Sequence, residues 1–171
     1  MYQPQVNLES GALYGVEALL RWDNPRLGSI TPEDFIPIAE ESGLIVELGT
    51  WVLDAACAQL ADWRVRGLGR LRVSVNISIH QFYHDGFLEM LQRTLTKYGV
   101  DPAQLVLEIT ESIASNADLV VAQLHELKKL GVKVALDDFG TGYSSLQYLK
   151  KYPIDYLKID RSFLEDMETN Q

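Results

Sequence analysis

The chain has a single cysteine, no long apolar run and few basic residues. Cys57 lies in a stretch with helical spacing, so no internal disulfide can form, and a buried small hydrophobe is a better interpretation than a reactive thiol. No apolar stretch approaches the roughly 20 residues that a membrane span requires, and the opening residues lack a basic segment followed by an apolar one. These absences favour a cytoplasmic protein.

The shortage of basic residues limits the partners that the chain can bind. Lys and Arg number 15 against 24 Asp and Glu, which gives a formal net charge of -9. A surface for nucleic acid polymers needs clustered basic side chains, so we expect none here. A small phosphate ligand is compatible with this charge if divalent cations lie between the phosphate and the acidic groups. Any phosphate chemistry therefore implies a metal.

The length and the order of the apolar segments predict one α/β domain. With 171 residues, of which 47% are hydrophobic, the chain can bury a single core. An opening strand, a tight turn at 9–11 and a returning segment at 12–20 predict an antiparallel hairpin. Thr31 can cap a helix that has Pro32 at its first position, and Gly43 would end that helix.

The rest of the chain alternates between helical and strand-like segments. Helical spacing is found at 47–67, 81–98, 118–130 and 146–152. Apolar strand-like segments are found at 71–78, 105–110, 132–138 and 154–160. Repeated strand, helix and strand indicate a parallel sheet, and the mostly apolar strands indicate that both faces of it are covered.

Successive side chains of a strand point to opposite faces, which separates polar from apolar positions here. One face would carry Asn76, Glu108 and Asp137 beside small or polar neighbours, as the inner wall of a barrel mouth does. Carboxylate oxygens at the ends of several parallel strands can converge on hard cations. The opposite face would carry the positions that pack against outer helices: Leu105, Leu107, Val134 and Leu136.

Six ordered segments resemble the EAL family of bacterial phosphodiesterase domains, which cleave cyclic di-GMP to linear pGpG. They are YQPQV at 2–6, GVEALLRW at 15–22, SVNIS at 74–78, LEITES at 107–112, ALDDFGTGYSSL at 135–146 and LKIDRSF at 157–163. The resemblance implies a TIM-barrel-like (β/α)8 fold with an antiparallel N-terminal strand, incomplete here, with about six strands and without the last two strand-helix units. It also implies a single domain over residues 1–171, truncated at both ends.

The resemblance assigns metal ligands to these strand ends. It implies that Glu17, Asn76, Glu108 and Asp137 bind one metal ion and that Asp138 binds a second. Such oxygen donors suit Mg2+ or Mn2+, and two of these ions can share and activate a water for attack on phosphorus. An acid at a strand end is, taken alone, more often a helix cap or a solvated loop residue. The joint occurrence of the motifs in order favours the metal site.

Four further residues receive roles from the resemblance. Lys158 would be catalytic, by orienting the attacking water or offsetting charge on the transition state. Glu111 would also act in catalysis, by tethering the loop that contains DFGTG. Gln3 and Arg21 would bind the substrate, Arg21 through the fork of its guanidinium. Taken alone, Lys158 would more often belong to a surface ion pair.

Functions from different classes remain open. The main hypothesis is metal-dependent hydrolysis of cyclic di-GMP to pGpG, with two Mg2+ or Mn2+ ions as cofactors. The alternative is a catalytically inactive cyclic di-GMP receptor or protein-interaction module, because the C-terminal catalytic segment of the family is missing. An enolase-like lyase, in which carboxylates and a lysine also lie at strand ends, is weaker.

The resemblance also implies partners beyond the nucleotide. A homodimer would form with a contact at 146–153, and other signalling domains would belong to the same protein. An incomplete barrel would expose the edge of its last strand, at 156–160. We expect self-association or segment exchange to cover that edge.

Overall fold

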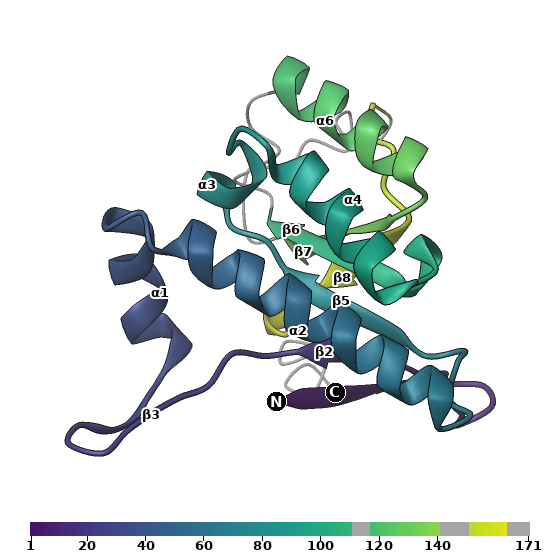
Figure 1. Cartoon of the computed structure of the whole chain (residues 1–171), viewed down its shortest axis with the longest axis horizontal. Coiled ribbons are helices and arrows are strands. Elements are labelled where there is room, and N and C mark those ends of the chain that lie inside the picture. The colour runs from purple at the N-terminus through teal and green to yellow at the C-terminus, as the bar shows by residue number, and fades with distance from the viewer. Residues whose placement is uncertain (111–116, 141–150, 164–171) are drawn as a thin grey trace.

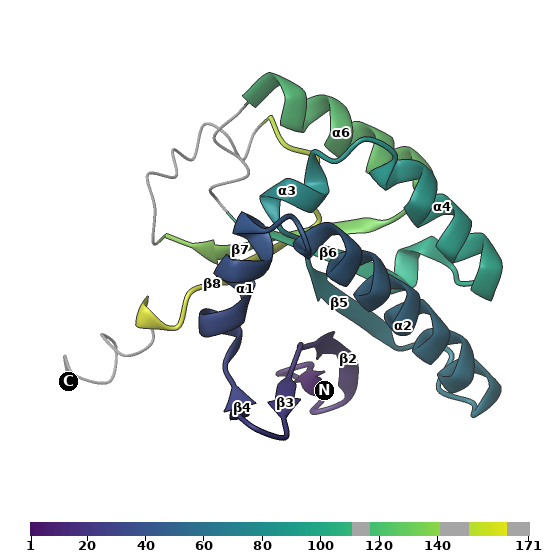
Figure 2. The same ribbon diagram turned by 60° about the vertical axis from the view of Figure 1, so that its left-hand side comes forward.

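The fold is built on a curled sheet of six strands in the order β1-β2-β5-β6-β7-β8 (Figures 1 and 2). The computed structural model describes residues 1–110, 117–140 and 151–163. β1 runs antiparallel to β2, and the other neighbouring strands are parallel. The α/β fold predicted from the sequence is confirmed. The strands are β1 (Tyr2–Val6), β2 (Leu13–Ala18), β5 (Arg72–Asn76), β6 (Leu105–Thr110), β7 (Lys133–Phe139) and β8 (Tyr156–Ile159).

The turn between β1 and β2 forms where the sequence predicts it. The Asn7 side chain accepts hydrogen bonds from the backbone N–H groups of Glu9 and Ser10, at 3.1 and 2.9 Å. Gly11 adopts a φ of +67°, which favours glycine. A polar side chain that bonds the backbone two and three residues ahead is a common way to close such a turn.

Helices cover the outer face of the sheet. In Figures 1 and 2, α2, α4 and α6 lie side by side over the strands. The helical elements are α1 (Pro32–Glu41), α2 (Ile45–Val65), α3 (Ile79–Phe82), α4 (Phe87–Tyr98), α6 (Ala117–Leu130) and the 3-10 turn η1 (Pro102–Gln104).

The core lies between these helices and the sheet. The strand positions predicted to face helices are all buried in one hydrophobic cluster: Leu105, Leu107, Val134 and Leu136. Leu53 and Cys57 of α2 join them and are fully buried. Burial raises the pKa of the Cys57 thiol to about 12, so this cysteine is a core residue and not a nucleophile at neutral pH.

The first helix begins and ends near the predicted residues, with one difference in detail. Thr31 immediately precedes α1, but its hydroxyl makes no capping bond to the backbone. It donates instead to the Asp34 carboxylate at 2.8 Å. Gly43, with a φ of +76°, follows the end of the helix at Glu41.

Two expectations about the elements were incomplete. The single helix predicted at 81–98 is wrong, because the chain forms α3 and α4 with a break at Gly86, where φ is +84°. A short hairpin of β3 (Trp22–Asn24) and β4 (Gly28–Ile30) was not predicted. The Asn24 side chain closes it by accepting from two backbone N–H groups, at 2.9 and 3.2 Å.

The last described segments bear on two further expectations. Most of the helix-like segment 146–152 lies outside the described residues, but Tyr152 is buried in the core. β8 is an edge of the described sheet, and Leu157 and Ile159 are 43% and 64% exposed there. Self-association across this edge stays a prediction. No helix in the described part of the chain is long and apolar enough to cross a membrane.

A half-buried ion-pair cluster joins α6, β7 and the segment before β8. The Asp155 carboxylate accepts from Lys128 at 2.5 Å, from Lys133 at 3.0 Å and from the Val134 backbone N–H at 3.0 Å. Burial alone would raise the pKa of Asp155, but these donors outweigh it and hold the pKa below its usual range. The carboxylate therefore stabilises the fold at neutral pH, and this stabilisation is lost as the pH falls through that lowered pKa.

Asp155→Asn should lower the free energy of unfolding by about 1–3 kcal/mol at neutral pH, since three donors lose an ionised acceptor. Urea unfolding followed by circular dichroism measures this. The control is Asp62→Asn, which breaks an exposed pair with Arg66 and should change stability by less than about 0.5 kcal/mol. Equal losses in the two variants would contradict a special role for Asp155.

Candidate metal centre

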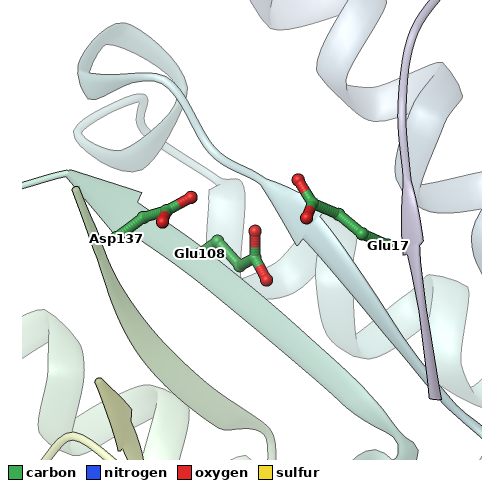
Figure 3. A group of neighbouring side chains, drawn as sticks. All are labelled: Glu17, Glu108 and Asp137. Atoms are coloured by element: carbon green, nitrogen blue, oxygen red, sulfur yellow. The ribbon is translucent and has the colours of Figure 1, made fainter. Parts of the chain in front are cut away.

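Three carboxylates from separate strands meet at one end of the sheet. Glu17 of β2, Glu108 of β6 and Asp137 of β7 each offer an oxygen, and these atoms lie within 4.8 Å of one another. Figure 3 shows the three side chains directed toward a common space. The strands run parallel, so residues near their carboxyl ends gather at the same edge. The predicted convergence of these residues is confirmed.

Lys158 of β8 lies among these carboxylates. Its ammonium donates to Glu108 Oε2 at 2.6 Å, to Asp137 Oδ2 at 2.7 Å and to Glu17 Oε2 at 3.3 Å. The lysine side chain is 28% exposed. One ammonium against three carboxylates leaves an excess of negative charge within this group when all four are ionised.

The burial of Glu108 sets the electrostatics of the site. This residue is 1% exposed, and burial raises its pKa to about 7, although the hydrogen bond from Lys158 acts in the opposite direction. The charges of Glu17 and Asp137 add to the increase. For Lys158, burial alone would lower the pKa, but the hydrogen bonds to Asp137 and Glu108 raise it. The lysine is therefore a permanent cation, while Glu108 titrates near neutral pH.

Asn76 extends the oxygen cluster. It is the last residue of β5, and its Nδ2 donates to Glu17 Oε1 at 2.9 Å. A carboxamide that donates through its nitrogen can offer its oxygen as an additional ligand. The strand register also pairs Asn76 with Glu108. The structure thus brings the amide to the carboxylates, as the sequence predicts.

Asp138 lies beside the three-carboxylate cluster and not within it. In the register, Leu136 pairs with Leu157 and Phe139 with Ile159, so β7 contains one residue more than β8 between these pairs. Such a bulge allows consecutive residues to depart from strict alternation. Asp138 adopts a φ of +53°, in the left-handed region.

The Asp138 backbone and side chain both interact with neighbouring acids. Its N–H donates to Asp137 Oδ1 at 2.9 Å, which fixes the bulge. Burial, followed by the charges of Asp137 and Asp160, raises the pKa of Asp138. A carboxylate whose pKa is raised by its neighbours in this way is stabilised in its ionised form when a cation lies near it.

The donors present fit a hard divalent cation. Carboxylate and amide oxygens are the ligands that Mg2+ and Mn2+ prefer, and the cluster contains no sulfur or imidazole among the described residues. The excess of negative charge would be offset by such an ion. Glu17, Asn76, Glu108 and Asp137 are therefore suited to hold one ion, with Asp138 at the margin.

A cavity of about 400 Å3 adjoins Asn76. Arg21 lines it together with Asn76, Ser78 and apolar side chains from α1 and α2. Arg21 is exposed and donates to the Leu20 backbone oxygen at 2.6 Å. Gln3 is exposed on β1 and lies opposite Glu17 in the strand register, hence on the same face of the sheet. Glu111 lies outside the described residues.

Gln81 is a polar residue of this cavity that sequence reasoning did not select. It is 2% exposed, and its Nε2 has no hydrogen-bond partner among the residues that the structure describes. The amide lies so close to Gly49 of α2 that a Cβ at that glycine would collide with it. In the sequence, Gln81 is marked only by its position shortly after the strand that carries Asn76. No pattern distinguishes it there from a solvated helix residue.

Comparison with known proteins gives a consistent assignment. The profile of the EAL domain matches residues 1–171. The bifunctional diguanylate cyclase/cyclic di-GMP phosphodiesterase MucR of Pseudomonas aeruginosa is 47% identical over 167 residues, which cover 97% of this chain and 24% of that protein. The cyclic di-GMP phosphodiesterase PA2567 of the same organism is 43% identical over 98% of this chain and 28% of its own length. The chain thus spans about a quarter of these relatives.

Solved structures agree with the sequence relatives. The PaMucR phosphodiesterase, in complex with c-di-GMP, has a TM-score of 0.94 and 46% identity, over 99% of this chain and 69% of the other. The FimX EAL domain from Pseudomonas aeruginosa, bound to c-di-GMP, has a TM-score of 0.87 and 26% identity, over 98% and 67% of the two chains. The family match covers every residue, and the fold agrees. The chain therefore belongs to the EAL family.

Proposed function

We propose that this chain contributes the metal centre of a phosphodiesterase that hydrolyses cyclic di-GMP to linear pGpG. The observation that carries the proposal is the meeting of Glu17, Glu108 and Asp137 around Lys158 at the carboxyl ends of parallel strands. A cavity lined by Arg21 adjoins Asn76, whose amide contacts Glu17. The relatives named as cyclic di-GMP phosphodiesterases support the choice of substrate.

The metal ligands would be Glu17, Asn76, Glu108 and Asp137 for one ion, with Asp138 for a second. Mg2+ or Mn2+ bound there would supply an activated water for in-line attack on phosphorus and would offset the charge of the phosphate. The protein's own contribution is to hold acidic oxygens close together against their mutual repulsion. The Lys158 ammonium makes this possible, although burial opposes the ionised form of Glu108.

Other residues would orient the substrate. Lys158 is a permanent cation and can orient the water or offset charge that develops on the transition state. The guanidinium of Arg21 can bind a phosphate through two N–H groups, and Gln3 offers an amide on the same face as Glu17. Glu111 would tether the loop after β7, a role that concerns residues outside those described.

The alternative is a cyclic di-GMP receptor or interaction module without turnover. A receptor has no need of metal ligands, whereas the five that the resemblance assigns within this chain are all present: Glu17, Asn76, Glu108, Asp137 and Asp138. We therefore favour the enzyme. The relatives are longer chains, and we propose that this chain is one EAL domain of a larger cytoplasmic signalling protein that acts as a homodimer.

Glu17→Ala should lower metal-dependent formation of pGpG by more than about 100-fold, since it removes a ligand of the ion that would activate the attacking water. Chromatography of pGpG, with Mn2+ or with EDTA, measures the loss. Glu9→Gln, in the exposed hairpin turn, is the control and should retain activity. Saturable binding of cyclic di-GMP without product in the unchanged chain would instead support the receptor.

Binding of Mn2+ without substrate should depend on the ionisation of Glu108. Because burial raises the pKa of Glu108 to about 7, a proton competes with the ion below that pH. The affinity should fall by about tenfold between pH 8 and pH 6 and change little above pH 8. Isothermal titration calorimetry at several pH values measures this.

Glu108→Gln is the matched variant for the pH series. It has no proton to exchange at this position, so its weaker Mn2+ binding should lose most of the pH dependence between 6 and 8. The same slope in the variant and the unchanged chain would show that another group is responsible.

A further inference from the structure

Phe163 contacts Gly140, just beyond the aspartates of β7. A Cβ built on Gly140 would collide with ring atoms Cε2 and Cζ of Phe163, so the ring lies directly against the glycine. Gly140 also adopts a φ of +101°. Two independent constraints, the backbone conformation and the ring, therefore require glycine at this position.

A short turn after β8 brings the ring to this place. Asp160 Oδ1 accepts from the Ser162 backbone N–H at 2.9 Å and from the Ser162 hydroxyl at 2.5 Å. The Phe163 N–H donates to the Asp160 backbone oxygen at 3.2 Å. The turn is thus closed by its own hydrogen bonds, and it fixes the position of Phe163 relative to the end of β8.

Phe163 is not a core residue, because 46% of it is exposed. Its contact therefore contributes less to global stability than to the local conformation of the chain at Gly140. Gly140 lies two residues after Asp138, whose positive φ and whose hydrogen bond to Asp137 define the bulge. Whatever holds Gly140 in place limits the motion of Asp138.

We propose that Phe163 is a positioning residue for Asp138. Its ring holds Gly140, and Gly140 in turn keeps the bulge in the conformation that places Asp138 beside Asp137 at the edge of the metal centre. The inference rests on the proposed function in so far as Asp138 serves a second ion. Glu17, Glu108 and Asp137 are held by Lys158 and do not depend on this contact.

Phe163→Ala should therefore weaken the binding of the second Mn2+ ion by about tenfold or more and leave the first ion nearly unchanged. Mn2+ titration followed by electron paramagnetic resonance counts the ions and gives both affinities. Hydrogen exchange by NMR gives a readout without metal, in which the Asp138 amide should exchange several-fold faster because its bond to Asp137 is loosened.

Two variants separate positioning from a general loss of structure. Phe163→Tyr keeps the ring and should restore both the second ion and the slow exchange of Asp138. Ile159→Ala removes an apolar side chain of the same segment that is 64% exposed, and it should change neither. Gly140→Ala should weaken the second ion as Phe163→Ala does, and the double variant should lose less than the sum, since the collision is then relieved.

The outcomes are distinguishable. If Phe163→Ala bound two ions with unchanged affinities, or lost affinity for both ions equally, the positioning role of Phe163 would be overturned. The proposed function would stand. The same loss in Ile159→Ala would also overturn the positioning role. No uptake of Mn2+ by the unchanged chain would overturn the proposed function, and this inference with it.

Discussion

The buried Glu108 carboxylate is the constraint on which the site depends. A carboxylate that is 1% exposed is costly unless a cation compensates it, and Lys158 provides the cation. Lys158 also contacts Glu17, although three strands separate β8 from β2 in the sheet order. Such a contact is possible only if the sheet curls. Tyr14 of β2 and Tyr156 of β8 form a second contact between these strands, packed edge to face with ring centroids 6.5 Å apart. The ion pairs of Lys158 therefore depend on the curl of the sheet and also hold together the carboxylates at its carboxyl end.

The same network prepares the site for metal. Removal of one partner from a buried ion pair typically costs about 3–5 kcal/mol, so Lys158 keeps the acids close together before any ion arrives. Because the cluster has more acids than Lys158 can neutralise, it retains affinity for further positive charge. Rigid strands supply Glu17, Glu108 and Asp137, whereas Asp138 depends on a bulge and on the segment that follows it. The two halves of the proposed metal centre are thus held by different means.

The sequence predicted the parts of the site that follow from strand alternation. Asn76 and Glu108 could be placed on the inner face because each lies between two apolar residues of its strand, and these neighbours are buried. The break at Gly86 was missed because the hydrophobic spacing continues on both sides of it. Contacts between distant segments, such as Phe163 with Gly140, have no local pattern at all. The motifs assigned roles to residues, but only the fold could supply their geometry.

The proposed metal centre can be tested most directly by anomalous diffraction from crystals of the chain grown with Mn2+. We expect a strong anomalous peak bounded by Glu17, Glu108, Asp137 and the Asn76 oxygen, with a second, weaker peak beside Asp138. A peak elsewhere on the acidic surface, with Lys158 as the only cation among the three carboxylates, would contradict it.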